Sequence, residues 1–458
     1  ESIERYLVDS MNFSEHKARQ IARDSKGSLA ALLWMIGSGP IAVPRWATRK
    51  DATTHASLML AGSWIGNNKN DAQIIEKLTQ KDYRDIETLL QSALLPDGPW
   101  IHQGVEWLCA SKDFVWSQLE QKITETMLQD FHEIVIDVVG EIDPSLELKP
   151  SERYMAPMLG KVRKYSSSLQ KGFVDSLARL AIVRTDGQGW ADKIIRSLLD
   201  PKHPDAHSRW LSLVDVYSEL AEAAPGIFLD SLDAILSQNP KFFFPDAFDK
   251  TDIFGPTSAH VYLLWALERL AWQHEYFTRV LAILAKLAEN SPEANSGNNP
   301  INSLVTILLP WRPQHNEKMS DAAQALEVLH RSSPDIAWEV AAELLPASYG
   351  VTSSNPKPEY RGEVNESKVT VNEYWEFIRS VVEKMVVWAD SNSKRLAGLV
   401  KAYPELQKGW DELGEMITTL LEKTNVDSWD DKDKVIVKNS IDNLISHHRE
   451  FEDAGCLL

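Results

Sequence analysis

Apolar residues recur at helical spacing along almost the whole chain. Near the N-terminus this spacing predicts three short helices. The first holds Leu7, the second opens at Ser14 and the third opens at Ser28, because serine is a favoured residue at helix starts. The third helix should stop where glycine and proline accumulate, at residues 37–40. We therefore expect residues 1–48 to form a small helical unit.

The pattern changes between residues 49 and 125, where helices give way to two short strand-like runs. A Pro-Asp-Gly turn at residues 96–98 precedes these runs and predicts a β-hairpin. A further helix should start at Ser111. Three helices followed by a hairpin is the arrangement of a winged-helix domain. The helices are expected at residues 56–64, 71–79 and 82–95, and the strands at 100–102 and 105–108.

The charges on the winged-helix candidates bear on what this region binds. Winged-helix proteins that bind DNA place a helix with basic side chains in the major groove. Here the two candidate helices and their flanks combine five acidic residues with three basic ones, which favours docking to protein instead. These residues are Asp71, Glu76, Asp82, Asp85 and Glu87 against Lys77, Lys81 and Arg84.

From about Met127 onward the chain is expected to be helical, with an internal repeat in its second half. Three segments align without gaps, at residues 225–236, 273–284 and 334–345, and another amphipathic helix precedes each. Such helical hairpins bury their apolar faces only by stacking on their neighbours. The predicted fold class is therefore all-α: a winged-helix domain with a small β-hairpin, followed by a HEAT/TPR-like α-solenoid. The expected domains are residues 1–48, 49–125, 126–200 as a helical connector and 201–458 as the helical repeats.

Two segments interrupt the predicted repeats. Residues 290–313 contain four prolines around a short apolar run, and residues 346–368 are polar. Exposed loops on rigid scaffolds commonly carry binding residues. The aromatic residues in or beside these segments are candidate contacts for a protein ligand, although residues of this kind more often belong to the core or to a solvated loop. They are Trp311, Trp338, Tyr349 and Tyr360.

The C-terminal part is predicted to hold two more apolar helices and a terminal one. The apolar helices are expected at residues 374–388 and 406–421, and an acidic turn at 427–433 follows them. The terminal helix should run from Val435 to about His448.

Composition indicates a folded protein with few nucleic-acid or membrane contacts. The 458 residues are 43% hydrophobic and 25% charged, which is typical of globular chains. The net charge of −18 repels nucleic-acid phosphates and anionic membranes, so neither is expected as a main partner. Two cysteines, Cys109 and Cys456, exclude a disulfide framework and fit a cytoplasmic protein. The uncharged stretch 27–44 is interrupted by glycines and prolines, so we interpret it as a helix end and a loop rather than a membrane span.

No complete catalytic or metal-binding motif is present in the sequence. The only Gly-Lys pair, Gly160-Lys161, lacks the rest of a phosphate-binding loop. The His-Glu pairs at His132 and His274 lack the second histidine of a zinc protease. The acidic turn at 427–433 lacks the glycine and glutamate of a calcium loop. We therefore predict no catalytic residue and no metal site, and interpret the basic cluster Lys161, Arg163, Lys164 and Lys171 as a solvated helix face.

Several stretches, in order, resemble the part of bacterial STAND NTPases that follows the ATPase core, as found in antiviral Avs-type defence proteins. Residues 13–15 (FSE) and 25–29 (SKGSL) are similar to the end of the helical lid, and residues 58–64 (LMLAGSW) to the first winged-helix helix. Residues 160–169 (GKVRKYSSSL) are similar to the junction into the helical region. Three later stretches are similar to the C-terminal repeats: 266–272 (ALERLAW), 299–304 (NPINSL) and 309–314 (LPWRPQ).

This resemblance implies a molecular switch. In such proteins the core binds ATP and Mg²⁺, the winged helix holds the resting state, and the repeats sense a protein ligand, for Avs-type members a phage protein. Sensing drives oligomerisation and activates an N-terminal effector. The implied partners are a protein ligand, the protein's own NTPase and effector domains, and further copies on activation. No cofactor is expected in this chain itself, and residues 1–48 would be a remnant of the lid.

The chain departs from relatives that contact the nucleotide with a Met-His-Asp string after the hairpin. Ala110-Ser111-Lys112 stands near that place, and His102 is the histidine close by, so His102 is the candidate for sensing nucleotide.

Two other hypotheses stay open. One is a stand-alone helical-repeat scaffold or adaptor without a nucleotide switch, which predicts a coding sequence that begins near Glu1. The sensor hypothesis instead treats the chain as a piece of a longer protein, because Glu1 starts inside a helical pattern. An enzyme would need a site assembled from distant acids or histidines, such as His102, His132 and His274.

Overall fold

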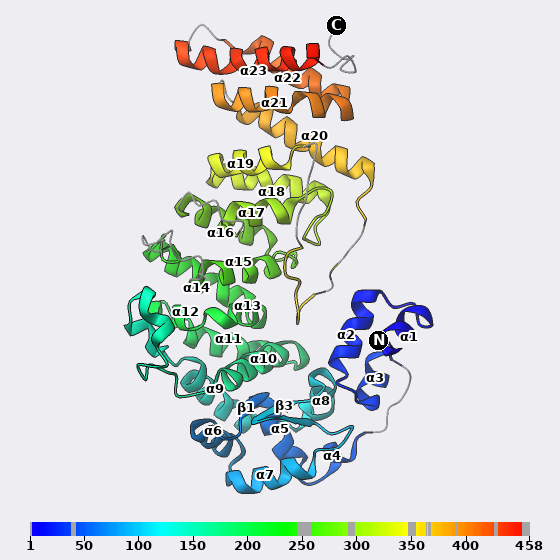
Figure 1. Cartoon of the computed structure of the whole chain (residues 1–458), viewed down its shortest axis with the longest axis vertical. Coiled ribbons are helices and arrows are strands. Elements are labelled where there is room, and N and C mark those ends of the chain that lie inside the picture. The colour runs from blue at the N-terminus through cyan, green and yellow to red at the C-terminus, as the bar shows by residue number, and fades with distance from the viewer. Residues whose placement is uncertain are drawn as a thin grey trace. The chain divides into compact units, whose positions relative to one another are not determined.

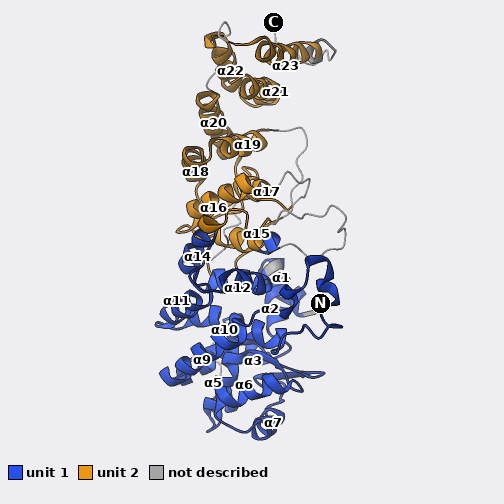
Figure 2. Cartoon of the chain, turned by 90° about the vertical axis from the view of Figure 1, so that its left-hand side faces the viewer, with its two compact units in different colours: residues 1–235, 252–262 blue, residues 236–251, 263–458 orange. Residues whose placement is uncertain are grey.

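The protein is mostly helical and contains one small three-stranded antiparallel sheet (Figure 1). The computed structural model describes residues 2–37, 43–244, 259–291, 298–346, 354–362, 364, 368–389, 392–425 and 429–450. Contacts divide the chain into two compact units, coloured separately in Figure 2. Unit 1 consists of residues 1–235 and 252–262, and unit 2 of residues 236–251 and 263–458.

The N-terminal segment forms the three predicted helices, α1 (Ser2–Asp9), α2 (Glu15–Asp24) and α3 (Leu29–Met35). Ser14 and Ser28 are their N-caps, and each hydroxyl accepts a backbone N–H of the first turn. Leu7, Ala18 and Ile21 form the shared core of α1 and α2. The predicted serine starts are therefore confirmed.

The following region contains the sheet. Strand β3 lies between β1 and β2 and pairs antiparallel with both. The predicted hairpin is confirmed as β2 and β3, and the predicted helix start near Ser111 is confirmed as α8. The elements are α4 (Arg45–Thr48), α5 (Ala52–Ala61), β1 (Ser63–Ile65), α6 (Lys69–Thr79), α7 (Tyr83–Ser92), β2 (Trp100–Gln103), β3 (Glu106–Cys109) and α8 (Lys112–Leu119).

The prediction that Trp64 lies in a helix was wrong. Helix α5 ends at Ala61, and Gly62 has a φ of +71°, a backbone conformation that favours glycine. The chain then continues as β1, where Trp64 is buried and pairs with Trp107 of β3. A glycine that reverses the chain inside an apolar run explains why helical spacing alone missed this strand.

Helix α10 (Ser167–Val183) crosses the end of α5 at very short range. A Cβ atom added at Gly172 would lie 2.2 Å from the carbonyl oxygen of Ala61. On either side the Ser176 hydroxyl donates to Met59 O at 3.0 Å and the Ser63 hydroxyl donates to Ser168 O at 2.8 Å. Only a residue without a side chain fits at position 172, because the two backbones are in contact.

The stretch from Arg163 to Ser168, which we call the junction segment, is bonded to several elements of unit 1. Asp71 of α6 is fully buried and accepts from the backbone N–H of Ile65 at 2.9 Å and of Ser166 at 3.0 Å, and from the Ser166 hydroxyl. The Glu141 carboxylate accepts the backbone N–H of Lys164 at 2.6 Å. Buried carboxylates of this kind are stabilised because backbone donors surround them.

The sequence suggested that the basic cluster near this segment forms a helix face, and this prediction was wrong. Lys161, Arg163 and Lys164 precede α10, and only Lys171 lies in the helix. The Arg163 guanidinium donates to the Ser212 carbonyl and to the Gln170 amide oxygen, the latter at 3.2 Å. Its role is therefore structural.

Helices and short 3-10 turns make up the rest of unit 1. Pro225 begins α14, as predicted from its position before an apolar helix. The elements are η1 (Glu120–Lys122), α9 (Glu125–Val139), η2 (Pro144–Glu147), η3 (Pro150–Met155), α11 (Gly187–Leu198), α12 (Ala206–Ser212), η4 (Val214–Val216), α13 (Tyr217–Ala223) and α14 (Pro225–Gln238). The last three residues of α14 belong to unit 2.

Unit 2 is built from helices that pack on their neighbours in the sequence. Helix α16 packs on α17 and α18, α18 packs on α19 and α20, and α21 packs on α22 and α23. Helix α15 (Ala259–Leu270) has its first four residues in unit 1 and the rest in unit 2. The helices that follow are α16 (Phe277–Asn290), α17 (Pro300–Leu308), α18 (Met319–Ser332), α19 (Pro334–Leu344), α20 (Val371–Trp388), α21 (Ser393–Gly409), α22 (Asp411–Lys423) and α23 (Asp431–Glu450).

Unit 2 corrects three predicted element boundaries. The proline-rich interruption 290–313 contains a helix, α17, which Asn299 caps and Pro300 opens. The helix predicted over 406–421 is broken at Trp410, whose backbone is extended between α21 and α22. Helix α23 starts at Asp431, so part of the predicted acidic turn forms its first turn, where acidic side chains suit the helix dipole.

Among the described residues, no helix is long and apolar enough to cross a membrane. The uncharged stretch 27–44 contains the short helix α3, after which Gly37 has a φ of +65°.

Candidate functional site

Three loops of unit 2 that are far apart in the sequence are bonded to one another. They are the turn 271–276 after α15, the loop 309–318 between α17 and α18, and the segment 354–362 after α19, and together we call them the loop edge. Asn316 donates to the Trp272 carbonyl at 2.7 Å, and the Arg312 guanidinium donates to the Ser354 hydroxyl. Arg269 at the end of α15 forms an ion pair with Glu359 at 3.6 Å.

Local sequence explains why the 309–318 loop projects Trp311 outward. Leu309 is extended, as expected before Pro310. The backbone N–H of Gln314 donates to Ile307 O at 3.1 Å and turns the loop back onto α17. Gln314 is thereby buried, whereas Trp311 at the tip keeps 45% of its surface exposed. An exposed indole on a fixed loop is the kind of group that anchors protein interfaces.

His315 is buried in the same loop, with 3% of its surface exposed. Its Nδ1 accepts the backbone N–H of Glu317 at 3.1 Å, and its ring packs on Phe277 with centroids 5.1 Å apart. Burial lowers the pKa of His315 to about 4, so the ring is neutral at pH 7. Since Nδ1 accepts, the proton is carried by Nε2. That N–H is buried and has no hydrogen-bond partner.

Three neighbours share this unpartnered state. The side-chain atoms Trp272 Nε1, Gln273 Nε2 and Gln314 Oε1 are also buried without a hydrogen-bond partner. Leaving such an atom unpaired costs about 1–3 kcal/mol. Most buried polar groups in folded proteins have a hydrogen-bond partner, so four such atoms without one set the loop edge apart.

A hydrogen bond between His274 and Glu317 links two parts of the loop edge. The Glu317 side chain, with 5% of its surface exposed, lies 2.7 Å from Nδ1 of His274, which is 85% exposed. Among the described residues, no group of three His, Cys, Asp or Glu side chains is arranged to hold a metal ion. The geometry of the loop edge is that of a binding surface with aromatic and hydrogen-bonding groups.

The predicted contact residues fall in different places. Trp311 lies on the loop edge, and so does the half-buried Tyr360, which follows the paired Glu359. Trp338 instead lies on α19, where the Arg395 guanidinium sits 5.2 Å over its ring. Arg395 also bonds Asp335 at 2.7 Å. Tyr349 lies outside the described residues. The loop edge therefore gathers two of the four candidates.

His102, the nucleotide-sensing candidate, lies in β2 opposite Trp107 of β3. The two rings stack with centroids 4.1 Å apart and an interplanar angle of 15°. His102 is exposed and covers the buried indole. This packing gives His102 a structural role in unit 1, and contact with a nucleotide stays a prediction.

In the interior beside this stack, two tryptophan N–H groups donate hydrogen bonds to neighbouring side chains. Trp100 Nε1 donates to His55 Nδ1 at 3.0 Å, and Trp64 Nε1 donates to the Tyr83 hydroxyl at 3.0 Å. Burial lowers the pKa of His55 to about 4, so it remains a neutral acceptor. Burial also raises the pKa of the Cys109 thiol to about 12, which makes it unreactive. These groups build a core rather than a reactive centre.

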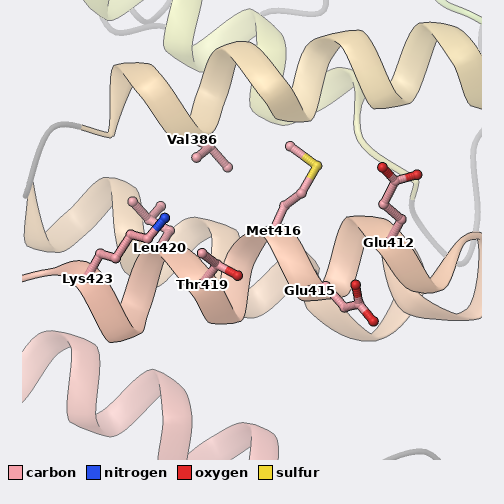
Figure 3. Close-up of a pocket in the computed structure, with 7 residues that line it drawn as sticks. All are labelled: Val386, Glu412, Glu415, Met416, Thr419, Leu420 and Lys423. Carbon is pink, nitrogen blue, oxygen red and sulfur yellow. The ribbon is translucent and has the colours of Figure 1, made fainter.

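A small pocket of about 340 Å³ lies between α20 and α22 in unit 2 (Figure 3). Val386 of α20 faces Met416 and Leu420 of α22, and charged residues stand at the rim. None of its lining residues has a buried polar atom without a partner. It is therefore a weaker binding candidate than the loop edge.

Sequence reasoning missed His315 and the other unpartnered atoms of the loop edge. The string 309–314 was noted for its resemblance, but nothing in it signals that the residue after it is buried. Burial here follows from the turn of the loop onto α17 and from the packing of His315 on Phe277.

Comparisons of the chain with protein-family models, with curated proteins and with solved structures found no match.

Proposed function

We propose that this chain is the ligand-sensing and regulatory part of a STAND-type antiphage defence protein. In this proposal the helix pairs of unit 2 recognise a protein ligand, and a winged-helix domain in unit 1 transmits the event. The single observation that carries the proposal is the order of elements in unit 1, α5–β1–α6–α7–β2–β3, with β3 between β1 and β2. A winged-helix domain has this order of helices and strands, and a hairpin as its wing.

The elements around the winged-helix candidate also support the proposal. The short helices α1 to α4 precede it, at the place where the resemblance implies the end of a helical lid. Helices that pack on their neighbours in sequence make up unit 2, which is the packing expected of an α-solenoid. Of the stretches that resemble the family, 58–64 spans the end of α5 and the start of β1, and 266–272 spans the end of α15 and its turn.

Charge favours a protein ligand over DNA. Helix α7, the last helix before the wing, begins with Asp82 as its N-cap and carries Asp85 in its first turn. Acidic groups at this end repel the phosphates that a recognition helix must approach. A protein surface has no such requirement.

The junction segment is a suitable path from the winged helix to the helices that follow. Asp71 of α6 bonds Ser166, which is the N-cap of α10. A displacement of α10 would therefore be passed to α6 and β1 through hydrogen bonds rather than through a flexible linker. In the full-length switch, ATP and Mg²⁺ would be bound by the NTPase core, and the effector and further copies would join on activation.

The first experiment is to read the coding DNA directly upstream of Glu1. An in-frame phosphate-binding loop would support the switch, and a start codon at or just before Glu1 would replace it with a stand-alone helical scaffold. The second experiment is phage challenge of bacteria that express the full-length gene. Trp311→Ala with Tyr360→Ala should reduce protection at least tenfold. Trp265→Ala, an exposed tryptophan within α15, is the matched control and should leave protection unchanged.

A further inference from the structure

The loop edge has a positive net charge, although the chain as a whole is strongly acidic. Together with Arg269 at the end of α15, its three loops carry five basic residues against three acidic ones. With neutral histidines their net charge is therefore +2, against −18 for the whole chain. The Glu359 carboxylate is paired with Arg269 and that of Glu317 is hydrogen-bonded to His274, whereas Glu275 is exposed. The basic residues are Arg269, Arg312, Lys318, Lys357 and Arg361.

Two of these cations lie close together on different loops. Arg312 is exposed beside Trp311, and its guanidinium donates to the Ser354 hydroxyl, which joins the two loops. Lys357 is partly buried in the second loop. Burial and the nearby Arg312 charge both lower the pKa of Lys357, without an opposing effect from a described carboxylate. Because like charges at short range repel, the pair costs free energy that an anionic partner would recover.

Prolines hold both cations in place. Lys357 lies between two prolines, and Pro313 follows Arg312. The proline ring fixes φ, so neither backbone segment can readily carry its cation away from the other. A surface with fixed side chains loses little conformational entropy when a partner binds. Tryptophan and arginine, which stand side by side here, are also the residue types most enriched at the energetic centres of protein interfaces.

We propose that the loop edge binds an acidic segment of the protein ligand, whose carboxylates lie against Arg312 and Lys357 while an apolar side chain packs on Trp311. This inference rests on the proposed function, because it names the chemistry of the ligand that unit 2 is proposed to recognise. A basic or neutral segment would leave the two neighbouring cations uncompensated, so charge complementarity selects an acidic one.

The charge of the remaining chain favours a protein segment over other anions. Nucleic acids and anionic membranes would meet the same cations, but they present extended negative surfaces. Outside the loop edge and Arg269 the chain carries a net charge of −20, which repels such a surface. A short acidic segment contacts only the positive loops.

The test measures binding of a short synthetic peptide to the full chain by fluorescence anisotropy. The peptide carries a rhodamine label and alternates glutamate with leucine and phenylalanine, and its matched control has glutamine in place of every glutamate. At low salt the glutamate peptide should bind about tenfold more tightly than the glutamine peptide. Sodium chloride should reduce this difference, because it screens exposed charges. Arg312→Gln with Lys357→Gln should lower the affinity for the glutamate peptide to that for the glutamine peptide.

A charge-matched variant separates the site from the field of the whole protein. Lys394→Gln with Lys401→Gln removes two exposed cations from α21 in the same unit and should keep the full affinity. Thermal unfolding of both double variants shows whether each is folded. Arg312→Gln alone changes an exposed side chain, so it gives the same test if the first double variant does not fold, with a loss of about threefold.

Three outcomes would overturn the inference. They are equal binding of the two peptides, an equal loss in the Arg312/Lys357 and Lys394/Lys401 variants, and tighter binding of an oligothymidylate of the same length, which would assign the surface to nucleic acid. Each leaves the proposed function to the phage challenge with Trp311→Ala and Tyr360→Ala. Conversely, unchanged protection in that challenge, with peptide binding that depends on Arg312 and Lys357, would refute the proposed function alone.

Discussion

The junction segment of unit 1 and the loop edge of unit 2 are both irregular stretches between helices. They differ in whether their polar groups have hydrogen-bond partners. In the junction segment, backbone donors find carboxylates: Ser166 bonds the buried Asp71, and Lys164 bonds Glu141. In the loop edge, His315 and Gln314 are buried with side-chain atoms that have no partner. The first arrangement fixes the chain, whereas the second leaves hydrogen-bonding capacity for something else to use.

The difference has a simple physical origin. A carboxylate accepts several hydrogen bonds at once, so Asp71 can satisfy donors from two separate segments, Ile65 of β1 and Ser166 of the junction segment. The loop edge contains Pro310 and Pro313, which lack N–H groups, and neutral amide and imidazole side chains with fewer options. Polar groups are thus paired in the junction segment and left partly unpaired in the loop edge, and the following changes test the contacts in each unit.

The largest effect is expected at the contact between α5 and α10. Gly172→Ala places a Cβ 2.2 Å from Ala61 O, so the two backbones must separate. We expect a loss of about 3 kcal/mol in the free energy of unfolding, measured by urea denaturation. Gly189→Ala in α11 is the matched control, since nothing lies within 4 Å of its new Cβ. That control should gain about 0.5–1 kcal/mol from helix propensity. Equal stability of the two variants would contradict the close approach.

Asp71→Asn tests the junction segment itself. The amide keeps one acceptor, but its N–H₂ group must face the N–H of either Ile65 or Ser166, because each of the two Asp71 oxygens accepts from one of them. We expect a loss of about 2 kcal/mol, together with faster amide hydrogen exchange at Ser166. Asp85→Asn on the exposed face of α7 is the control and should cost less than about 0.5 kcal/mol. Unchanged exchange at Ser166 would show that the segment is held by other contacts.

Glu268 in unit 2 predicts a pH dependence. Burial between α15 and α17 raises its pKa from 4.5 to about 7, against the lowering effect of the Ser303 hydroxyl, which donates at 2.6 Å. Because the folded pKa lies above the unfolded one, the folded chain holds this proton more tightly, and stability is lost as pH rises from about 4.5 to about 7. Glu268→Gln should therefore match the wild type near pH 4.5 and exceed it by on the order of 2 kcal/mol at pH 8.

The measurement is chemical denaturation of wild type and variant across that pH range. Glu275→Gln, which removes an exposed carboxylate in the adjoining turn, is the control and should show no such divergence. A constant difference between Glu268→Gln and wild type at all pH values would mean that the carboxyl does not titrate in this range.

The smallest effects compare two tryptophans of unit 2. Trp338→Ala removes a half-buried ring and its stacking with Arg395, which should cost about 1.5 kcal/mol. Trp311→Ala removes an exposed ring and should cost about 0.5 kcal/mol. Thermal unfolding of both variants checks the order. A larger loss at Trp311 would make it a packing residue and weaken its assignment as a ligand contact.

The sequence predicted the helices and the hairpin well, because their signals are local. Ser14 and Ser28 cap the helices that they were expected to open, and the Pro-Asp-Gly turn precedes the two strands as expected. Strand β1 was missed because three residues after a glycine carry too little periodicity to stand out from the helix before them. The break at Trp410 was missed because apolar residues continue at helical spacing on both sides of the extended Trp410.

The candidate site was less accessible to sequence reasoning. Exposed aromatics in loops can be proposed from composition, and Trp311 is indeed exposed. Whether two loops meet cannot be read from their residues, and the bond from Asn316 to Trp272 joins positions 44 residues apart. Whether His315 Nε2 has a hydrogen-bond partner also depends on how the loops pack, because neighbouring loops supply the acceptors.

The hydrogen bonds between Asp71 and Ser166 bear on which fragments of this chain can fold when they are expressed alone. The two residues stand 95 positions apart, and a fragment that ends at residue 125 keeps the first and discards the second. Such a fragment would expose the groove on α5 that Gly172 and Ser176 occupy and strand a charge in its interior. A fragment that continues through Val183 retains both, and we expect it to be the shorter piece recovered folded from expression.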